Sequence, residues 1–197
     1  MAFLTMTYRY IRNSQLWGVF LFMGITLLFH VLWRLGRGWL EHWDVYIMMS
    51  DRAVQHVYAV SATINEFLLG DAVQRIDVAC SFRLTGQTNG GAFTGTLVVD
   101  HTCSGLKQFY QALALFLLYP GPGKHKLWYI PMVLLVMHLV NIFRIVALSF
   151  TMIYMFQHWD FMHDWVLRPL FYVVLFALWV LWEERFRSRQ KPRHVAN

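Results

Sequence analysis

The stretch Asp100-His101-Thr102-Cys103-Ser104-Gly105-Leu106-Lys107-Gln108 joins a polar, strand-like segment to a long apolar one. It places a cysteine, Cys103, at the first turn of an expected membrane helix. A helix N-terminus carries a partial positive charge and unpaired backbone N–H groups, and both favour a thiolate over a thiol. We therefore expect the pKa of Cys103 to lie below that of an ordinary cysteine.

The composition is that of an integral membrane protein with several spans. Of the 197 residues, 57% are hydrophobic and 14% are charged, which is about half the usual charged share. The net charge of +6 does not indicate nucleic-acid binding, because the basic residues flank apolar runs as cytoplasmic membrane flanks do. These clusters are Arg9 and Arg12, Lys124 and Lys126, and Arg185, Arg187, Arg189, Lys191 and Arg193. We expect no cofactor and no metal.

The apolar runs predict an all-α polytopic membrane protein with about four transmembrane helices in a single domain, residues 1–197. The expected spans are residues 16–33, 103–119, 129–150 and 165–182. Basic residues before the first span place the N-terminus inside. Residues 36–102 then form an outer segment, and the basic tail 183–197 is cytoplasmic. The expected location is the cytoplasmic (inner) membrane, with both termini in the cytoplasm.

The outer segment combines two kinds of pattern. Between residues 45 and 67 apolar side chains recur at three- and four-residue spacing, which predicts an amphipathic helix ending near Gly70. Residues 76–84 alternate between apolar and polar or small, residues 86–91 are turn formers, and residues 94–99 read as a returning strand. We therefore predict a small β-hairpin that leads to Cys103.

The second cysteine, Cys80, lies on the same outer side, where disulfides persist. If the hairpin turns at Asn89-Gly90, Cys80 lies opposite roughly Val99. Cys103 is then several residues further along, at about 3.3 Å each, which is too far for a disulfide without bending. We expect a free thiol at Cys103.

Three polar residues share one face of the third span, because His138, Asn141 and Arg144 stand three residues apart. An arginine in a span is costly and normally faces a partner or a wet cavity. Counted from Leu127, Arg144 lies roughly 25 Å along the helix axis. That depth is near the outer leaflet, at the level of Cys103. The alternative is that Asn141 and Arg144 hold helices together.

A histidine, His163, precedes the fourth span on the outer side. Cys103, Arg144 and His163 are thus each expected at the outer end of a different span. His101, two residues before Cys103, and His158, in the outer loop, are alternative candidates for a catalytic histidine.

Three motifs in this order resemble the exosortase/archaeosortase family. They are Cys103-Ser104-Gly105-Leu106 opening a span, Asn141-Ile142-Phe143-Arg144-Ile145 late in another, and His163 before the last. The resemblance covers roughly residues 45–182, and the chain is short beside the many members that have additional spans. It implies a membrane cysteine peptidase or transpeptidase that processes proteins bearing a C-terminal sorting signal.

The resemblance also implies roles for individual residues. Cys103 would be the nucleophile, with Arg144 and His163 as its catalytic partners. Asn141, Ser104 and Gly105 would support them. The expected partners are the lipid bilayer and membrane-anchored protein substrates with a hydrophobic C-terminal helix and a basic cluster.

Two other functions compete with this one. The first is a non-catalytic membrane scaffold or accessory subunit of an envelope or polysaccharide assembly system. A structural Cys103 should then be inert, whereas a catalytic one should be alkylated from outside at a lower pH than an ordinary thiol. The second, a transporter, is less favoured because transporter sites lie near the bilayer midplane, and the polar groups here gather nearer the outer face.

Overall fold

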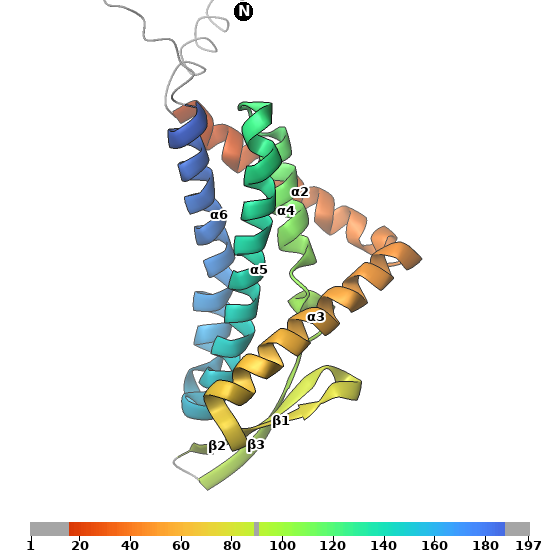
Figure 1. Ribbon diagram of the computed structural model, residues 1–197, viewed down its shortest axis with the longest axis vertical. Coiled ribbons are helices and arrows are strands. Elements are labelled where there is room, and N and C mark those ends of the chain that lie inside the picture. The colour runs from red at the N-terminus through yellow and green to blue at the C-terminus, as the bar shows by residue number, and fades with distance from the viewer. Residues whose placement is uncertain (1–15, 89–90, 188–197) are drawn as a thin grey trace, which may run out of the picture.

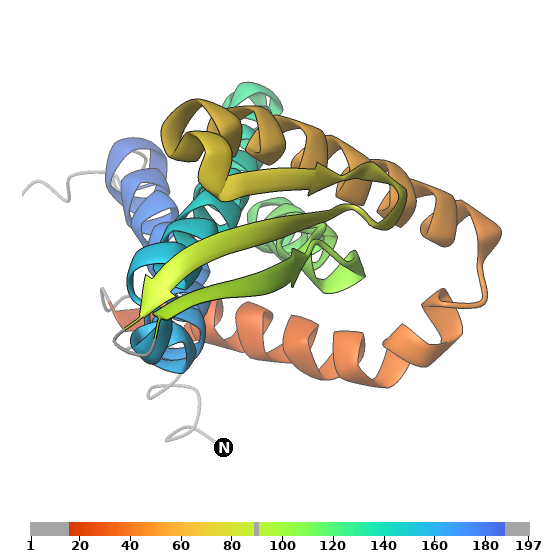
Figure 2. The same ribbon diagram turned by 90° about the horizontal axis from the view of Figure 1, so that it is seen from below.

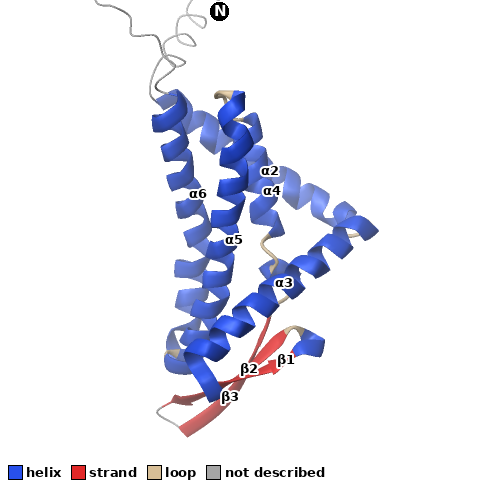
Figure 3. Ribbon diagram, in the orientation of Figure 1, coloured by secondary structure: helices blue, strands red, loops and turns tan. Residues whose placement is uncertain are grey.

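A computed structural model describes residues 16–88 and 91–187. Its helices are α2 (Leu16–Leu40), α3 (Asp44–Leu69), α4 (Leu106–Leu118), α5 (Gly123–Tyr154) and α6 (Arg168–Trp182). Figure 1 shows α4, α5 and α6 running roughly along the long axis, while α2 and α3 diverge from a shared corner. A small sheet closes the end of the molecule opposite the α4–α5 turn (Figure 3). The basic clusters before residue 16 and after residue 187 lie outside the described residues.

Within residues 16–88 and 91–187, three helical stretches are long and apolar enough to cross a membrane: Trp17–Leu40, Gly123–Tyr154 and Phe161–Phe186. They contain the expected spans 129–150 and 165–182, and all but the first residue of 16–33. The stretch Phe161–Phe186 is α6 with the π-helical turns Phe161–Leu167 and Glu183–Arg187 at its two ends. The predicted helical fold is therefore confirmed, with three helices whose length and composition suit a membrane span.

The expected second span, 103–119, is shorter than predicted. Helix α4 has 13 residues, so it is about 20 Å long against an apolar bilayer thickness of about 30 Å. His101–Cys103 form a separate 3₁₀ turn, and Gly105 adopts φ 79°. This left-handed residue interrupts the helical hydrogen bonding, so α4 begins only at Leu106.

The predicted amphipathic helix is present as α3 and ends at Gly70. Its buried face differs from the expected one. Val54, Tyr58 and Ala62 are buried, whereas Val45 and Phe67 of the predicted apolar stripe are exposed. The reason is that α3 packs through a line that includes polar residues, which a hydrophobic pattern does not reveal.

The predicted hairpin is one part of a three-stranded antiparallel sheet. Its strands are β1 (Val73–Ile76), β2 (Ser81–Thr88) and β3 (Gly91–Val98), in the order β1-β2-β3. The expected strand 76–84 is broken by a 3₁₀ turn at Asp77–Ala79, followed by Cys80 with φ 44°. This turn reverses the chain and creates the extra strand β1. Figure 2 shows the sheet lying across the ends of the helices.

Two apolar cores divide the molecule along its length. The first joins α3, the sheet and the C-terminal part of α5, through residues such as Val57, Phe82 and Ile145. The second joins α4, the N-terminal part of α5 and α6, through residues such as Leu115 and Met137. Because α5 belongs to both, its residues between 137 and 145 lie at the boundary of the two cores.

The close packing of the sheet on α5 can be tested with Gly86→Ala. A Cβ at Gly86 would lie 2.6 Å from the carbonyl oxygen of Ile153, so the substitution should lower the free energy of unfolding by about 1–3 kcal/mol. The measurement is thermal unfolding of the purified protein in detergent, followed by tryptophan fluorescence. Gly38→Ala, where a Cβ meets open space, is the control and should not lower the midpoint. Equal midpoints for the two variants would contradict this packing.

Candidate functional site: the Cys103 turn and the Arg144 cavity

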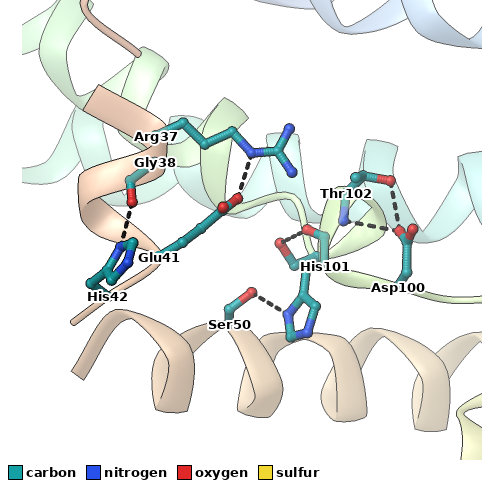
Figure 4. Close-up of polar contacts among 9 residues, drawn as sticks. Arg37, Gly38, Glu41, His42, Ser50, Asp100, His101 and Thr102 are labelled. Carbon is teal, nitrogen blue, oxygen red and sulfur yellow. Dashed lines mark hydrogen bonds and ion pairs between the residues drawn. The ribbon is translucent and has the colours of Figure 1, made fainter. Parts of the chain in front are cut away.

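The turn that holds Cys103 is capped by the side chain of Asp100. Its Oδ1 accepts hydrogen bonds from the backbone N–H of Thr102 at 2.9 Å and from the Thr102 hydroxyl at 2.6 Å (Figure 4). It also accepts one from the backbone N–H of Cys103 at 3.2 Å. Desolvation opposes ionisation of Asp100, but these hydrogen bonds outweigh it and lower the pKa of the carboxyl. The ionised carboxylate therefore fixes the turn.

Asn141 fastens the same turn to α5. Its Nδ2 donates a 2.8 Å hydrogen bond to the carbonyl oxygen of Cys103, and the residue is fully buried. Gly105 makes this approach possible in two ways. Its φ of 79° is a conformation that other residues rarely adopt, and a Cβ there would lie 3.0 Å from Asn141 Nδ2. Asn141 and Gly105, predicted as supporting residues, thus contact one another beside Cys103.

Ser104 has a structural part in the turn. Its hydroxyl donates to the carbonyl oxygen of His101 at 2.7 Å and accepts from the backbone N–H of Leu106 at 3.3 Å. The side chain is buried. Ser104 therefore links the 3₁₀ turn to the first residue of α4.

Both cysteines are free thiols in the structure. Ser81 pairs with Val98, and the backbone N–H of Val99 donates to the carbonyl oxygen of Cys80 at 3.0 Å. The expected register, with Cys80 opposite Val99, is therefore confirmed.

The electrostatics of Cys103 correct the expectation of a lowered pKa. Burial raises the pKa of the thiol, and the positive charge of Arg144 acts in the opposite direction without overcoming it. The thiol also lies ahead of α4 rather than in its first turn, because Gly105 separates them.

Arg144 is 6% exposed and lies at the boundary between the two cores. Its guanidinium carbon lies 5.9 Å from the ring centroid of Phe171 on α6, a cation–π contact. Its Nε is buried and has no hydrogen-bond partner among residues 16–88 and 91–187. The guanidinium interacts electrostatically with Cys103. Cys103 and Arg144, both predicted site residues, thus lie near enough to influence one another electrostatically.

His163 lies elsewhere on the same side of the molecule. Its Nδ1 is 2.8 Å from Asp164 Oδ1, and its ring stacks on Trp159 at a centroid distance of 5.9 Å. Phe171, which touches Arg144, follows it by eight residues, or about 12 Å of helical rise. Within the described residues, no contact joins His163 to Cys103 or Arg144. The structure therefore does not bring the third expected residue to the thiol.

The two alternative histidines differ in position. His101 belongs to the Cys103 turn, and its Nδ1 is 2.9 Å from the Ser50 hydroxyl on α3 (Figure 4). Its Nε2 is 3.7 Å from Asp51 Oδ1, an ion pair when the ring is protonated. His158 is exposed in the turn after α5. Of the three histidines, only His101 is on the turn that carries the thiol.

A cavity of about 750 Å³ opens beside the turn. It lies within the wedge between α2 and α3, and α4, α5 and α6 complete its walls. Arg144, His101, Thr102 and Ser104 all line it. Cys103 is not among its lining residues, although both of its neighbours are. A substrate in this cavity would therefore lie next to the turn, with Arg144 facing it.

The rest of the lining was not recognised from sequence. Arg34 and Arg37 come from the C-terminal end of α2, Lys107 and Gln108 from the first turn of α4, and Arg168 from the start of α6. In the sequence these residues look like ordinary charged or polar ends of membrane helices. Among the residues of the site that were not predicted, Asp100 had the clearest signal in the sequence. An Asp shortly before a turn often caps the backbone N–H groups of that turn.

Neither a protein-family model, nor a curated protein, nor a solved structure matches this chain.

The thiol and Arg144 can be tested by titrating alkylation in a Cys80→Ala background. The rate of reaction of Cys103 with iodoacetamide should rise only at a pH above that of an ordinary thiol, since burial disfavours the thiolate. Arg144→Gln should move this rise to still higher pH, because the charge that favours the thiolate is lost. The measurement is the pH dependence of the alkylation rate by mass spectrometry.

Arg168→Gln is the matched control for this titration. It removes a charge from the same cavity that is not among the groups acting on Cys103, so the profile should stay unchanged. Two results would contradict this account of Cys103 and Arg144. One is a rise in the wild-type alkylation rate at a lower pH than for an ordinary thiol. The other is the same pH profile for Arg144→Gln and wild type.

Proposed function

We propose that this protein is a membrane cysteine peptidase or transpeptidase resembling the exosortases. It cleaves a C-terminal sorting signal of exported proteins at the outer face of the cytoplasmic membrane. The observation that supports this most directly is the juxtaposition of a free thiol, Cys103, with a buried arginine, Arg144, whose Nε has no partner in the described part of the chain. A cavity large enough to hold a small molecule opens beside these two residues.

The proposed topology has four crossings and both termini in the cytoplasm. The sheet and the outer turn lie at one end of the helices, and the α4–α5 turn lies at the other (Figure 1). Lys124 and Lys126 follow that turn, as expected for a cytoplasmic end. Helix α4 crosses together with its flanking turns, shielded from lipid in part by α2 and α5, with which it is in contact.

In the proposed reaction, Cys103 loses its proton to a histidine and its thiolate attacks the scissile carbonyl carbon. The resulting tetrahedral oxyanion collapses to a thioester when the C–N bond breaks, and the histidine returns the proton to the leaving amine. The oxygen of water, or the nitrogen of an amine acceptor, then attacks the thioester and releases the thiol. Arg144 cannot act as the base, but it stabilises the thiolate and the oxyanion.

His163 is the histidine proposed from the family resemblance. Its contact with Asp164 supports this, because a carboxylate that orients an imidazole is a recurrent feature of nucleophilic catalysis. His101 is the alternative, since it shares the turn of Cys103 and lines the cavity. With His163 as the base, substrate binding must move the start of α6 towards the turn.

A non-catalytic scaffold is the competing proposal. The burial that raises the pKa of the Cys103 thiol favours it, and so do two contacts. The hydrogen bond from Asn141 to the Cys103 carbonyl joins two elements, as does the stacking of Arg144 on Phe171. Both contacts would stabilise the fold of a protein with no activity.

Catalysis by Cys103 and Arg144 is tested by alanine substitution. Cys103→Ala should lower processing by at least about 10³-fold because the nucleophile is lost. Arg144→Ala should lower it by about 10²–10³-fold, the usual effect of removing an oxyanion-stabilising group. The assay follows shortening of an exported protein encoded near this gene that ends in a short motif, an apolar helix and a basic cluster. Cys80→Ala, which removes the other free thiol, is the control and should process normally. Full processing by Cys103→Ala would exclude the peptidase and leave the scaffold.

The histidine assignment is tested with three parallel variants in the same assay. His163→Ala should lower processing about 10²–10⁴-fold, the range for a general acid–base residue. His158→Ala, an exposed residue of the same outer loop, should process as wild type. Activity retained in His163→Ala and lost in His101→Ala would transfer the role to His101.

A further inference from the structure

The cavity beside the turn contains many more positive than negative groups. Five cationic side chains line it: Arg34, Arg37, Lys107, Arg144 and Arg168. Glu41 is the sole carboxylate in its lining. The side chains come from α2, α4, α5 and α6, so folding brings together charges that are far apart in sequence.

Most of this positive charge is uncompensated. Arg37 pairs with Glu41 at 2.6 Å, and Arg168 pairs at 3.0 Å with Asp164, which is outside the lining. For Arg34, Lys107 and Arg144, residues 16–88 and 91–187 supply no ion-pair partner. Arg37 and Lys107 are close enough to repel one another. Like charges in a partly buried site destabilise the fold unless an anion accompanies them.

Arg144 supplies the strongest sign of a ligand. Its side chain is more than nine-tenths buried, it lines the cavity, and its Nε–H has no acceptor among the described residues. A buried donor without a partner costs about 1–3 kcal/mol. An acceptor in the cavity would remove this cost.

We propose that this cavity binds a phosphate group. Several guanidinium groups and one ammonium group line the same cavity. The oxygens of a phosphate group can accept hydrogen bonds from all of them at once. A planar carboxylate presents two oxygens in one plane, whereas the oxygens of a phosphate group point in tetrahedral directions, towards cations on several helices. The volume of about 750 Å³ fits a phosphate together with the organic group that carries it.

The surroundings fit a phosphate carried by a lipid or supplied free in solution. Trp33, Tyr46 and Phe171 add aromatic walls, and tryptophan and tyrosine gather at the headgroup level of membranes. On α2, Leu28, Leu32 and Leu35 are all exposed, the first two lying two turns and one turn before the third, so an acyl chain could lie along that helix. The argument for this site does not rest on the peptidase chemistry proposed above, although the two proposals share Arg144.

The test measures binding to the purified full chain in non-ionic detergent at about 0.15 M salt, where weak surface attraction is screened. The probes are phosphatidylglycerol, inorganic phosphate, and succinate as a dicarboxylate of similar charge, with diacylglycerol as the phosphate-free lipid. Binding is followed by the rise in unfolding temperature and by native mass spectrometry. Phosphatidylglycerol or inorganic phosphate should bind, and succinate and diacylglycerol should not.

The variants locate the site. Arg34→Gln combined with Lys107→Gln should weaken phosphate-group binding about tenfold or more, as expected for the loss of two charge-assisted hydrogen bonds. Arg52→Gln combined with Arg83→Gln removes the same charge from exposed positions outside the cavity and should change affinity less than twofold. Should the cavity variant fail to fold, Lys107→Gln alone replaces it, with the same direction of change.

Comparing phosphatidylglycerol with inorganic phosphate identifies the source of the phosphate group. Binding of phosphatidylglycerol without inorganic phosphate assigns a lipid headgroup, and binding of both with the same loss in the cavity variant assigns the phosphate group itself. The proposal is overturned if neither probe binds the wild type, if succinate binds as tightly, or if the two double variants lose affinity equally. None of these readouts depends on peptidase activity, so this proposal can fail while that one stands.

Discussion

The hydrogen bond from Asn141 Nδ2 to the carbonyl oxygen of Cys103 determines where the thiol lies. It joins the longest helix, α5, to the turn between the sheet and α4. The bond is possible because Gly105 adopts φ 79° and leaves room for the amide, and because Asp100 caps the turn from the other side. Asn141 lies where the two apolar cores meet, so breaking this bond would leave its buried amide N–H without a partner.

The same boundary sets the electrostatics of the site. Burial raises the pKa of the Cys103 thiol, and the positive charge of Arg144 acts in the opposite direction. The arginine keeps its charge because its intrinsic basicity is very high. In the proposed peptidase, a nucleophile stored as a thiol would be protected from oxidants until a base takes its proton. For that proposal the placement of His101 and His163 therefore matters more than the helix N-terminus.

Sequence patterns located the elements more accurately than they located the site. The end of α3 at Gly70 and the register that sets Cys80 opposite Val99 follow from local turn and alternation signals, and both are confirmed. The predicted buried face of α3 was wrong because the face that packs includes polar residues. One of them is Asn65, whose side chain donates a hydrogen bond to the Ser149 hydroxyl. Local sequence signals did not predict the turn at Asp77–Ala79 or the cationic cavity. The charges of the cavity come from four helices, and only tertiary packing shows that Arg34 and Lys107 line one space.

Arg144 acts electrostatically on the Cys103 thiol and also lines the cavity, so ionisation of the thiol and binding in the cavity are thermodynamically coupled. The guanidinium is the group that favours the Cys103 thiolate, and it also faces the space in which we place a phosphate. An anion bound there would cancel part of its charge and so disfavour the thiolate. Linkage is reciprocal, so ionisation of Cys103 must weaken the anion's binding by the same factor. If both proposals hold, the anion and the thiolate compete for one buried cation, and an occupied cavity keeps the nucleophile protonated until the anion leaves or is displaced.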